Sequence, residues 1–257
     1  MKKTNIKTKV LCFSNHKGGV GKSCSACNVG AGLSIKGHKV LVVDLDPQAN
    51  LSLSLGVKDA EKTIYQVLHG EKKCGECIYN ITENFDIIPS TLDLAGAELE
   101  LAAEAGREVI LKEAIDDLFG KYHYIIIDCA PSLGLLTTNA LTASHEVMIP
   151  IQAQYLSLQG ISKLTDVIEK IRKRLNKSLM VGGVFITQYD ARKVLNRDIS
   201  SAIEKYFPKD VFKTKIRDNV ALAEAPSHGK DIFRYNSKSS GALDYTALCD
   251  EIIKRHK

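Results

Sequence analysis

Residues 15–24, NHKGGVGKSC, combine glycines, lysines and a hydroxyl in an order that suits the binding of phosphate groups. Residues 21–23 (GKS) match the end of the phosphate-binding loop pattern G-x-x-x-x-G-K-[ST]. His16 occupies the place of the first glycine, so the strict pattern fails, and an extra lysine, Lys17, precedes the glycine pair. The run therefore indicates either a broken nucleotide site or one of a different type.

Each residue type in this run has a separate part in holding phosphate. Gly18, Gly19 and Gly21 let backbone N–H groups turn inward and approach an anion closely. A helix is expected to start at Lys22 and to point its N-terminus at the same anion. Lys22 is predicted to contact the β- and γ-phosphates, and the Ser23 hydroxyl to bind Mg²⁺.

Three carboxylates follow strand-like segments elsewhere in the chain. HYIIID ends at Asp128, which is expected to hold magnesium through water. VVDLDPQAN places Asp44 and Asp46 beyond another strand, and we predict that Asp46 orients a water while Asp44 tethers the loop or a magnesium-bound water. The candidate magnesium ligands are thus Ser23, Asp46 and Asp128.

Apolar strands that alternate with helices must position these residues. The sequence predicts strands over Lys9–Ser14, Lys39–Asp44, Phe85–Pro89, His123–Asp128, Glu146–Ile151 and Met180–Thr187. It predicts helices over Lys22–Ile35, Leu158–Leu175 and Ala242–Arg255, and a helical stretch over Leu92–Leu118 that breaks near Gly106. This alternation indicates a single-domain α/β fold, with a mostly parallel sheet covered by helices on both faces. Ligands bind beyond the carboxyl ends of such strands, where the loop and the three aspartates fall.

The composition is that of a soluble globular protein, with 44% of the 257 residues apolar and 25% charged. No apolar run reaches membrane-spanning length, and the basic start lacks a signal-peptide core, so we expect a cytoplasmic protein. Seven cysteines, an odd number, argue against a disulfide framework. The C-x-x-C pairs Cys24/Cys27 and Cys74/Cys77 lack a second half at zinc-ribbon spacing and are expected to be buried or incidental thiols.

Charge is distributed unevenly along the chain. Residues 1–160 contain 15 Lys/Arg and 18 Asp/Glu, a net charge of −3, whereas residues 161–257 contain 20 and 12, a net charge of +8. The C-terminal part is therefore the candidate surface for a polyanion, although solvated helices also use many lysines.

Longer segments extend the match beyond the loop. KGGVGKS is followed by VDLDPQAN, IIDCAPSLGLLTTNAL, IPIQAQYLSLQGIS, ITQYDARKVLNRDI, EAPSHGKDI and GALDYTALCDEI. From Val10 to Ile253, the chain resembles the deviant Walker A ATPases of the ParA/Soj partition family. MinD, arsenic-pump and nitrogenase-iron relatives share the first motif, but DLDPQ, IPIQ…SLQG and EAPSHG point more specifically to ParA. The resemblance implies the P-loop NTPase fold, in one CobQ/CobB/MinD/ParA-like domain over residues 1–257.

The resemblance also implies roles for the site residues. Lys17 matches the signature lysine, which reaches across an ATP-dependent sandwich homodimer to the partner's phosphates. Lys22 matches the loop lysine, Asp46 the water-orienting acid and Asp128 the Walker B acid, and residues 128–139 match a switch that senses the γ-phosphate. The implied cofactors are ATP and Mg²⁺. The implied catalytic residues are Lys17, Lys22 and Asp46, and the implied nucleotide contacts are Lys17, Gly18, Gly19, Val20, Gly21, Lys22, Ser23 and Cys24.

DNA and protein partners follow from the same resemblance. Relatives bind DNA without sequence preference as ATP dimers on the nucleoid, and a ParB-type centromere-binding protein stimulates their hydrolysis. The candidate DNA contacts here are Arg192, Lys193, Arg197, Arg217, Lys230 and Arg234. The segment IRDNVALAEAPS departs from the family, because Asp218 and Ala221 replace two usual arginines while Arg217 appears one place early. A rearranged or weaker DNA surface is therefore left open.

Other functions remain as alternatives to a slow ParA-type ATPase in chromosome or plasmid segregation. A MinD-like membrane-cycling ATPase needs an amphipathic C-terminal helix, but ALCDEIIKRHK offers only Cys249, Ile252 and Ile253 as nearby apolar anchors, so we expect no stable membrane association. A regulatory or cargo-positioning ATPase would use the same core. Cys129 stands alone after its strand, which disfavours an electron-transfer type, and the full-length match disfavours a dethiobiotin-type ligase.

Overall fold

A computed structural model describes residues 6–154 and 157–257. Within these residues, one sheet contains eight strands in the order β3-β4-β2-β5-β1-β6-β7-β8. Their bounds are β1 Lys9–Phe13, β2 Val40–Leu45, β3 Tyr79–Thr82, β4 Phe85–Ile88, β5 Tyr124–Cys129, β6 Glu146–Gln152, β7 Met180–Tyr189 and β8 Val211–Arg217. Neighbouring strands are parallel except for β3, which runs antiparallel to β4.

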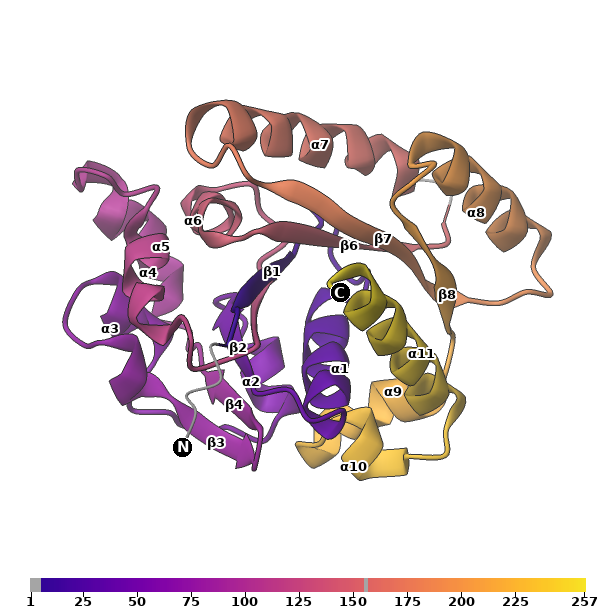
Figure 1. The fold of residues 1–257 in the computed structure, drawn as a ribbon, viewed down its shortest axis with the longest axis horizontal. Helices are drawn as coiled ribbons and strands as arrows, with labels where there is room; N and C mark the ends of the chain where they lie inside the picture. Colours follow the sequence, from indigo (N-terminus) through magenta and orange to yellow (C-terminus); the bar gives the residue numbers. More distant parts are fainter. Residues whose placement is uncertain (1–5, 155–156) are drawn as a thin grey trace.

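Helices cover both faces of this sheet (Figure 1). The α-helices are α1 Lys22–Ile35, α2 Asn50–Ser54, α3 Ile64–Leu68, α4 Leu94–Glu100, α5 Ile110–Ala114, α6 Leu135–Ala143, α7 Ser157–Arg174, α8 Val194–Tyr206, α9 Val220–Glu224, α10 Ile232–Asn236 and α11 Ser240–Arg255. Short 3-10 turns lie at Cys74–Cys77, Leu101–Ala103, Asp116–Leu118 and Ala225–His228. In the described part of the chain, no helix is both long and apolar enough to cross a membrane.

Successive residues of the central strands enter two separate cores. In β1, Val10 and Cys12 pack with α3 to α8, while Leu11 and Phe13 pack with α1, α2, α10 and α11. A strand turns alternate side chains to opposite faces, so a sheet buried on both sides needs continuous apolar runs. The runs VLCF and YIII meet this need, which explains why the sequence signals these strands so clearly.

The predicted fold class is confirmed, as a single-domain α/β fold with a mostly parallel sheet. All six predicted strands are present, with ends shifted by at most two residues, and α1 has the predicted bounds. The predicted break near Gly106 is also confirmed, because α4 and α5 are separate and Gly106 has a φ of 71°. The two edge strands β3 and β8 were not predicted.

Candidate functional site

The carboxyl ends of β1, β2 and β5 bring the predicted site residues together. Asp44 and Asp128 are direct partners in the register of β2 and β5, and the loop of residues 14–21 follows β1 on the other side of β5. These three strands are adjacent, so the loop and both carboxylates lie together at the carboxyl end of the sheet. Asp46 follows two residues after Asp44.

Glycine conformation and two contacts from β7 shape the loop. Gly19 and Gly21 have φ angles of 72° and 85°, in the left-handed region that favours glycine. Thr187 Oγ1 donates a hydrogen bond to the carbonyl of Val20 at 2.8 Å, and Gln188 Nε2 donates to the carbonyl of Gly19 at 2.9 Å. The N–H groups of residues 18–21 have no acceptor among the described residues, so they can bind an anion. Gly21 then caps the start of α1.

Lys22 lies beneath the loop with its ammonium largely enclosed. The residue is 6% exposed, and Nζ donates to the carbonyl of Lys17 at 3.3 Å. Burial lowers the pKa of Lys22, and the charges of Asp128, Cys129 and Asp46 oppose that shift. A buried ammonium with one weak hydrogen bond retains donors for an anion.

Asp128 is fully buried, and neither carboxylate oxygen has a partner at ordinary hydrogen-bond geometry within the described residues, although the Ser23 hydroxyl is near. Burial and the neighbouring Asp44 charge raise the pKa of Asp128 well above its usual range, while the Ser23 hydroxyl and Lys22 oppose the shift. An unsatisfied carboxylate beside a hydroxyl suits Mg²⁺, which takes few protein oxygens and completes its octahedron with water and phosphate. Across the described ranges no three His, Cys, Asp or Glu side chains form a metal cluster.

Asp44, in contrast, is fully occupied by hydrogen bonds. Its carboxylate accepts from the N–H of Asp46 at 3.2 Å, from the N–H of Ser52 at 2.8 Å and from the Ser52 hydroxyl at 2.7 Å. Burial raises the pKa of Asp44 to about 6, although the bonds from Ser52 and Asp46 counteract this. Asp44 therefore tethers residues 46–52, a different segment from the phosphate loop considered in the sequence analysis.

Asp46 is buried, and one of its carboxylate oxygens has no hydrogen bond to the described residues. One oxygen accepts from the N–H of Gln48 at 2.9 Å, and the residue is 5% exposed. Its charge acts on Lys22, so it lies near the ammonium that closes the site. This arrangement permits the predicted role of orienting a water.

Lys17 is directed away from its own loop. Its Nζ donates to Gln154 Oε1, beyond the end of β6, at 3.1 Å, while its N–H donates to Asn15 Oδ1 at 3.1 Å. A neutral amide holds the ammonium here without an ion pair. The structure thus separates the two lysines, with Lys22 under the loop and Lys17 beside it.

A pocket of about 350 Å³ adjoins the loop and was missed by the sequence analysis. Its lining includes Gly21, Thr187, Gln188, Arg217, Asn219 and Tyr245. Asn219 Oδ1 is buried without a partner in the described chain, while its amide donates to Ser240. The altered segment IRDNVA was considered only as a DNA surface, yet it supplies one wall of this pocket.

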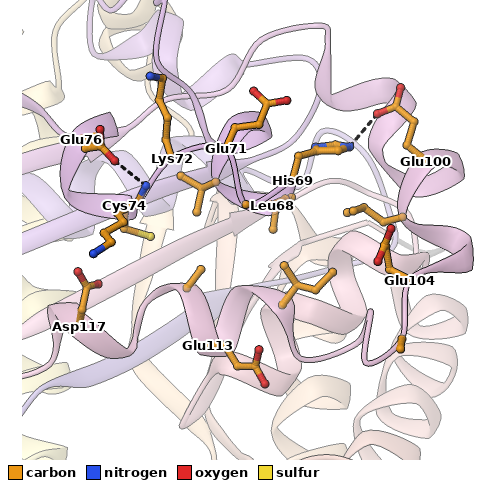
Figure 2. A pocket seen from close by; sticks show the side chains of 17 residues that line it. Leu68, His69, Glu71, Lys72, Cys74, Glu76, Glu100, Glu104, Glu113 and Asp117 are labelled. Carbon is orange, nitrogen blue, oxygen red and sulfur yellow. Dashed lines mark hydrogen bonds and ion pairs between the residues drawn. The ribbon is translucent and has the colours of Figure 1, made fainter.

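A larger cavity, of about 850 Å³, lies away from the loop between α3, α4 and α5 (Figure 2). Its rim carries Glu71, Glu76, Glu100, Glu104, Glu113 and Asp117, against His69, Lys72 and Lys73. The excess of carboxylates would repel phosphate, so size alone does not identify the nucleotide site.

The six candidate DNA contacts do not form one patch. Arg192, Lys193 and Arg197 lie at the start of α8, whereas Arg234 lies on α10, on the opposite side of the molecule in Figure 1. Ion pairs engage three of the arginines, which are Arg192 with Asp190, Arg217 with Asp244 and Arg234 with Asp231. DNA contacts by these side chains stay a prediction.

The cysteines agree with the simplest expectation. All seven are free, and Cys27, Cys74 and Cys77 are buried. The half-buried Cys24 thiol lies 3.7 Å from the hydroxyl of Tyr245 in α11, so it packs at the first turn of α1.

Comparison with known proteins places this geometry in context. The AAA domain family model matches residues 8–181. The chain is 46% identical to the sporulation initiation inhibitor protein Soj of Bacillus subtilis, over 95% of this chain and 98% of that protein. It is 42% identical to the chromosome-partitioning ATPase Soj of Treponema pallidum, over 96% of this chain and 98% of that protein. The fold is also similar to the structure of cobyrinic acid a,c-diamide synthase from Mycobacterium smegmatis with bound ADP and magnesium, with a TM-score of 0.86. The two sequences are 33% identical, and the match covers 97% of this chain and 95% of that chain.

Proposed function

Because the chain belongs to the Soj/ParA family of partitioning ATPases, we propose that it binds and slowly hydrolyses ATP and acts in chromosome or plasmid segregation. The observation that carries the proposal is that Asp128 and Lys22 lie close together at the carboxyl ends of β5 and β1. Among the described residues, neither Asp128 oxygen has a partner at ordinary hydrogen-bond geometry, Lys22 Nζ makes one weak bond, and the N–H groups of residues 18–21 have no acceptor. Mg²⁺ and a polyphosphate together satisfy all three.

Transfer of the γ-phosphate to water needs charge stabilisation and an aligned nucleophile. We assign charge stabilisation to Lys22 and the loop N–H groups, and alignment of water to the free oxygen of Asp46. Ser23 and Asp128 would hold magnesium, which screens phosphate charge when bound. The nucleotide contacts extend over residues 17–24.

The pocket beside Gly21 is assigned to the nucleobase. Asn219 Oδ1 is an unpaired acceptor in its wall, and adenine carries an exocyclic amine where guanine carries a carbonyl. This acceptor favours ATP over GTP. Asn219→Ala is expected to reduce that preference, measured as the ratio of the two nucleotides' dissociation constants.

Lys17 is assigned to the ATP of a second subunit, so that dimerisation depends on ATP. The amide of Gln154 holds its ammonium outside its own loop, and a neutral acceptor releases a cation more readily than a carboxylate would. Lys17→Ala should bind nucleotide but stay monomeric with ATP, as measured by light scattering on a sizing column. An ATP-dependent dimer of Lys17→Ala would refute this role.

Turnover tests the catalytic assignment. Lys22→Ala and Asp46→Ala are each expected to lower ATP hydrolysis by roughly 10²-fold or more, because each removes a group acting on the reacting phosphate or water. Lys62→Ala is the control, because Lys62 is exposed and is not one of the candidate site residues. Unchanged turnover in either site variant would show that the site is elsewhere.

We further propose that the ATP dimer binds nucleoid DNA in the cytoplasm without sequence preference and responds to a ParB-type partner. The support is the family membership together with the net charge of +8 over residues 161–257. Gel shifts with ATP, ADP and no nucleotide, over a salt series, test the DNA step. Nucleotide-independent shifts would contradict the cycle.

The packing of α11 disfavours a membrane-cycling function. Tyr245, Leu248, Cys249 and Ile252 are buried against α1 and β8, so the apolar face of this helix already lies in the core. Membrane binding through α11 would require its release. Pelleting with anionic liposomes in the presence of ATP should leave the protein in solution. Cargo-positioning and regulatory roles use the same ATPase core, and identifying the bound partner protein would distinguish them from segregation.

A further inference from the structure

A second group of ionisable side chains lies at the amino ends of the central strands, opposite the carboxyl ends that carry the phosphate loop. A cavity of about 400 Å³ opens beside the first residues of β1 and β5, about 15 Å along the strands from the phosphate loop. Its polar lining comprises Lys7, Lys9, His38, His123, Tyr124 and His256, from four separate segments. Three of the chain's seven histidines thus face one space, and no carboxylate is among the described residues that line it.

The hydrogen bonds of the lining histidines leave ring donors without a partner among the described residues. His123 Nδ1 accepts from the N–H of Lys39 at 2.9 Å, so the proton of the neutral ring resides on Nε2. Within the described chain, no acceptor pairs with that Nε2–H. The side chain of His38 likewise has no hydrogen bond to the described residues, and its ring centroid lies 5.3 Å from those of both His123 and Tyr124.

The one nearby carboxylate is already neutralised. Glu146 pairs with Lys9 Nζ at 2.7 Å and with His256 Nε2 at 2.9 Å. The Nδ1 of His256 lies 3.3 Å from the Tyr124 hydroxyl, so both nitrogens of that ring are engaged. Lys7 is exposed and forms no ion pair with the described residues. Its positive charge therefore stays uncompensated at the cavity.

We propose that this cavity is a binding site for a small oxyanion of the phosphate class, held by Lys7, His38 and His123. These three groups supply N–H donors from three segments, and no carboxylate among the described residues lines the cavity to pair with them. A tetrahedral oxyanion presents acceptors in several directions, which suits donors that line one cavity from separate segments. The site is independent of the nucleotide loop and of the proposed ATPase activity.

Binding at this site is linked to proton uptake. Burial and the adjacent His123 lower the pKa of His38, and an anion counteracts both causes. The charged and titratable groups around His38 are Lys7 and Lys9, Lys39, His123 and Tyr124, His256, and Glu146 behind them. Cations predominate among these groups, so affinity should rise as the pH falls from 8 to 6.

Sulfate titration of the full-length protein saturated with Mg·ADP tests the site, because ADP occupies the phosphate loop and the charge of sulfate is constant over this pH range. Calorimetry should show one site that tightens toward pH 6. NMR should show shifts of the His38, His123 and His256 ring signals, with little change at His228, which is exposed on the far side of the chain. Inorganic phosphate and glycerol 3-phosphate, in separate arms, distinguish free from esterified phosphate.

Two variants link the signal to the cavity. Lys7→Gln removes the exposed cation, and His123→Asn retains an acceptor for the Lys39 N–H while removing Nε2–H. Each should weaken sulfate binding by about tenfold, the value of one charge-assisted hydrogen bond. Lys58→Gln, an exposed lysine elsewhere, should bind as the parent does. Parent-like binding by both cavity variants, or absence of the histidine shifts, would overturn the proposal.

Discussion

At the scale of single residues, the two facing aspartates of β2 and β5 show how one side-chain type serves two purposes. Asp44 receives three hydrogen bonds and fixes a turn, whereas Asp128, its register partner, has only the nearby Ser23 hydroxyl as a donor among the described residues, short of ordinary hydrogen-bond geometry. An unpaired buried carboxylate costs folding free energy, and functional sites commonly retain such groups. The contrast marks Asp44 as a structural acid and leaves Asp128 as the candidate ligand-binding acid.

Asp128→Asn should therefore exchange function for stability. The amide should lower magnesium-dependent ATP turnover by roughly 10²-fold, because it removes the charge that attracts the metal. The same change removes a buried carboxyl that is costly to ionise beside Asp44, so the nucleotide-free variant should unfold at an equal or higher temperature than the parent. Calorimetry without nucleotide and a phosphate-release assay check the two halves. A less stable variant with normal turnover would contradict both.

Glu146, at the amino end of β6, should make the stability of the protein depend on pH. Burial alone would raise its pKa, but the bonds from His256 and Lys9 lower it to about 2. A depressed carboxyl pKa contributes stability that is present above the unfolded value and is lost as the pH falls from about 4.5 toward 2. Glu146→Gln should thus reduce the free energy of unfolding by about 2 kcal/mol at pH 7, and by progressively less below pH 4. Urea unfolding at pH 7, 5 and 3.5 measures the difference, and a pH-independent difference would exclude the ion pair as its source.

At the scale of elements, α1 is pressed closely onto the sheet at Gly30. A Cβ there would lie 2.8 Å from the Phe85 ring and 2.9 Å from Val42, both fully buried. Gly30→Ala should destabilise the protein by about 1–2 kcal/mol, because overpacking outweighs the gain of about 1 kcal/mol in helix propensity. Gly75→Ala, where a Cβ meets nothing within 4 Å, is the matched control. Thermal melts of both variants test this, and a stabilised Gly30→Ala would show that α1 can shift outward.

The elements also show what could be predicted from the sequence. Buried parallel strands need apolar runs on both faces, so all six with such runs were predicted. The strands that were missed lie at the sheet edges, where β8 buries only Phe212 and Ile216 among charged neighbours and β3 buries none of its four residues. The phosphate loop was visible as a local motif. The pocket beside Gly21 was not, because β7, β8 and α11 meet there only through the tertiary fold.

At the scale of the whole molecule, an acidic cavity and a basic helix start lie at opposite ends of the long axis. The acidic cavity lies between α3, α4 and α5 at one end in Figure 1, and α8 with its basic start lies at the other. The separation agrees with the net charges of −3 and +8 for residues 1–160 and 161–257. A polyanion should therefore approach the α8 end, and the carboxylates at the far end should repel it.

Ion pairing decides which basic residues can contribute to that approach. Lys193 has a side chain that is 61% exposed and only a loose contact with Asp190 at 4.0 Å, whereas Arg234 is bonded to the buried Asp231 that caps α10. Lys193→Ala should lower the slope of log K against log salt for duplex DNA by about one, as expected for one lost phosphate contact. Arg234→Ala should leave the slope nearly unchanged, because its charge is already paired. Fluorescence anisotropy with Mg·ATP between 50 and 200 mM salt measures both, with thermal melts to verify folding. Equal losses would mean that the Arg234–Asp231 pair opens on DNA, and that the basic surface extends from α8 to α10.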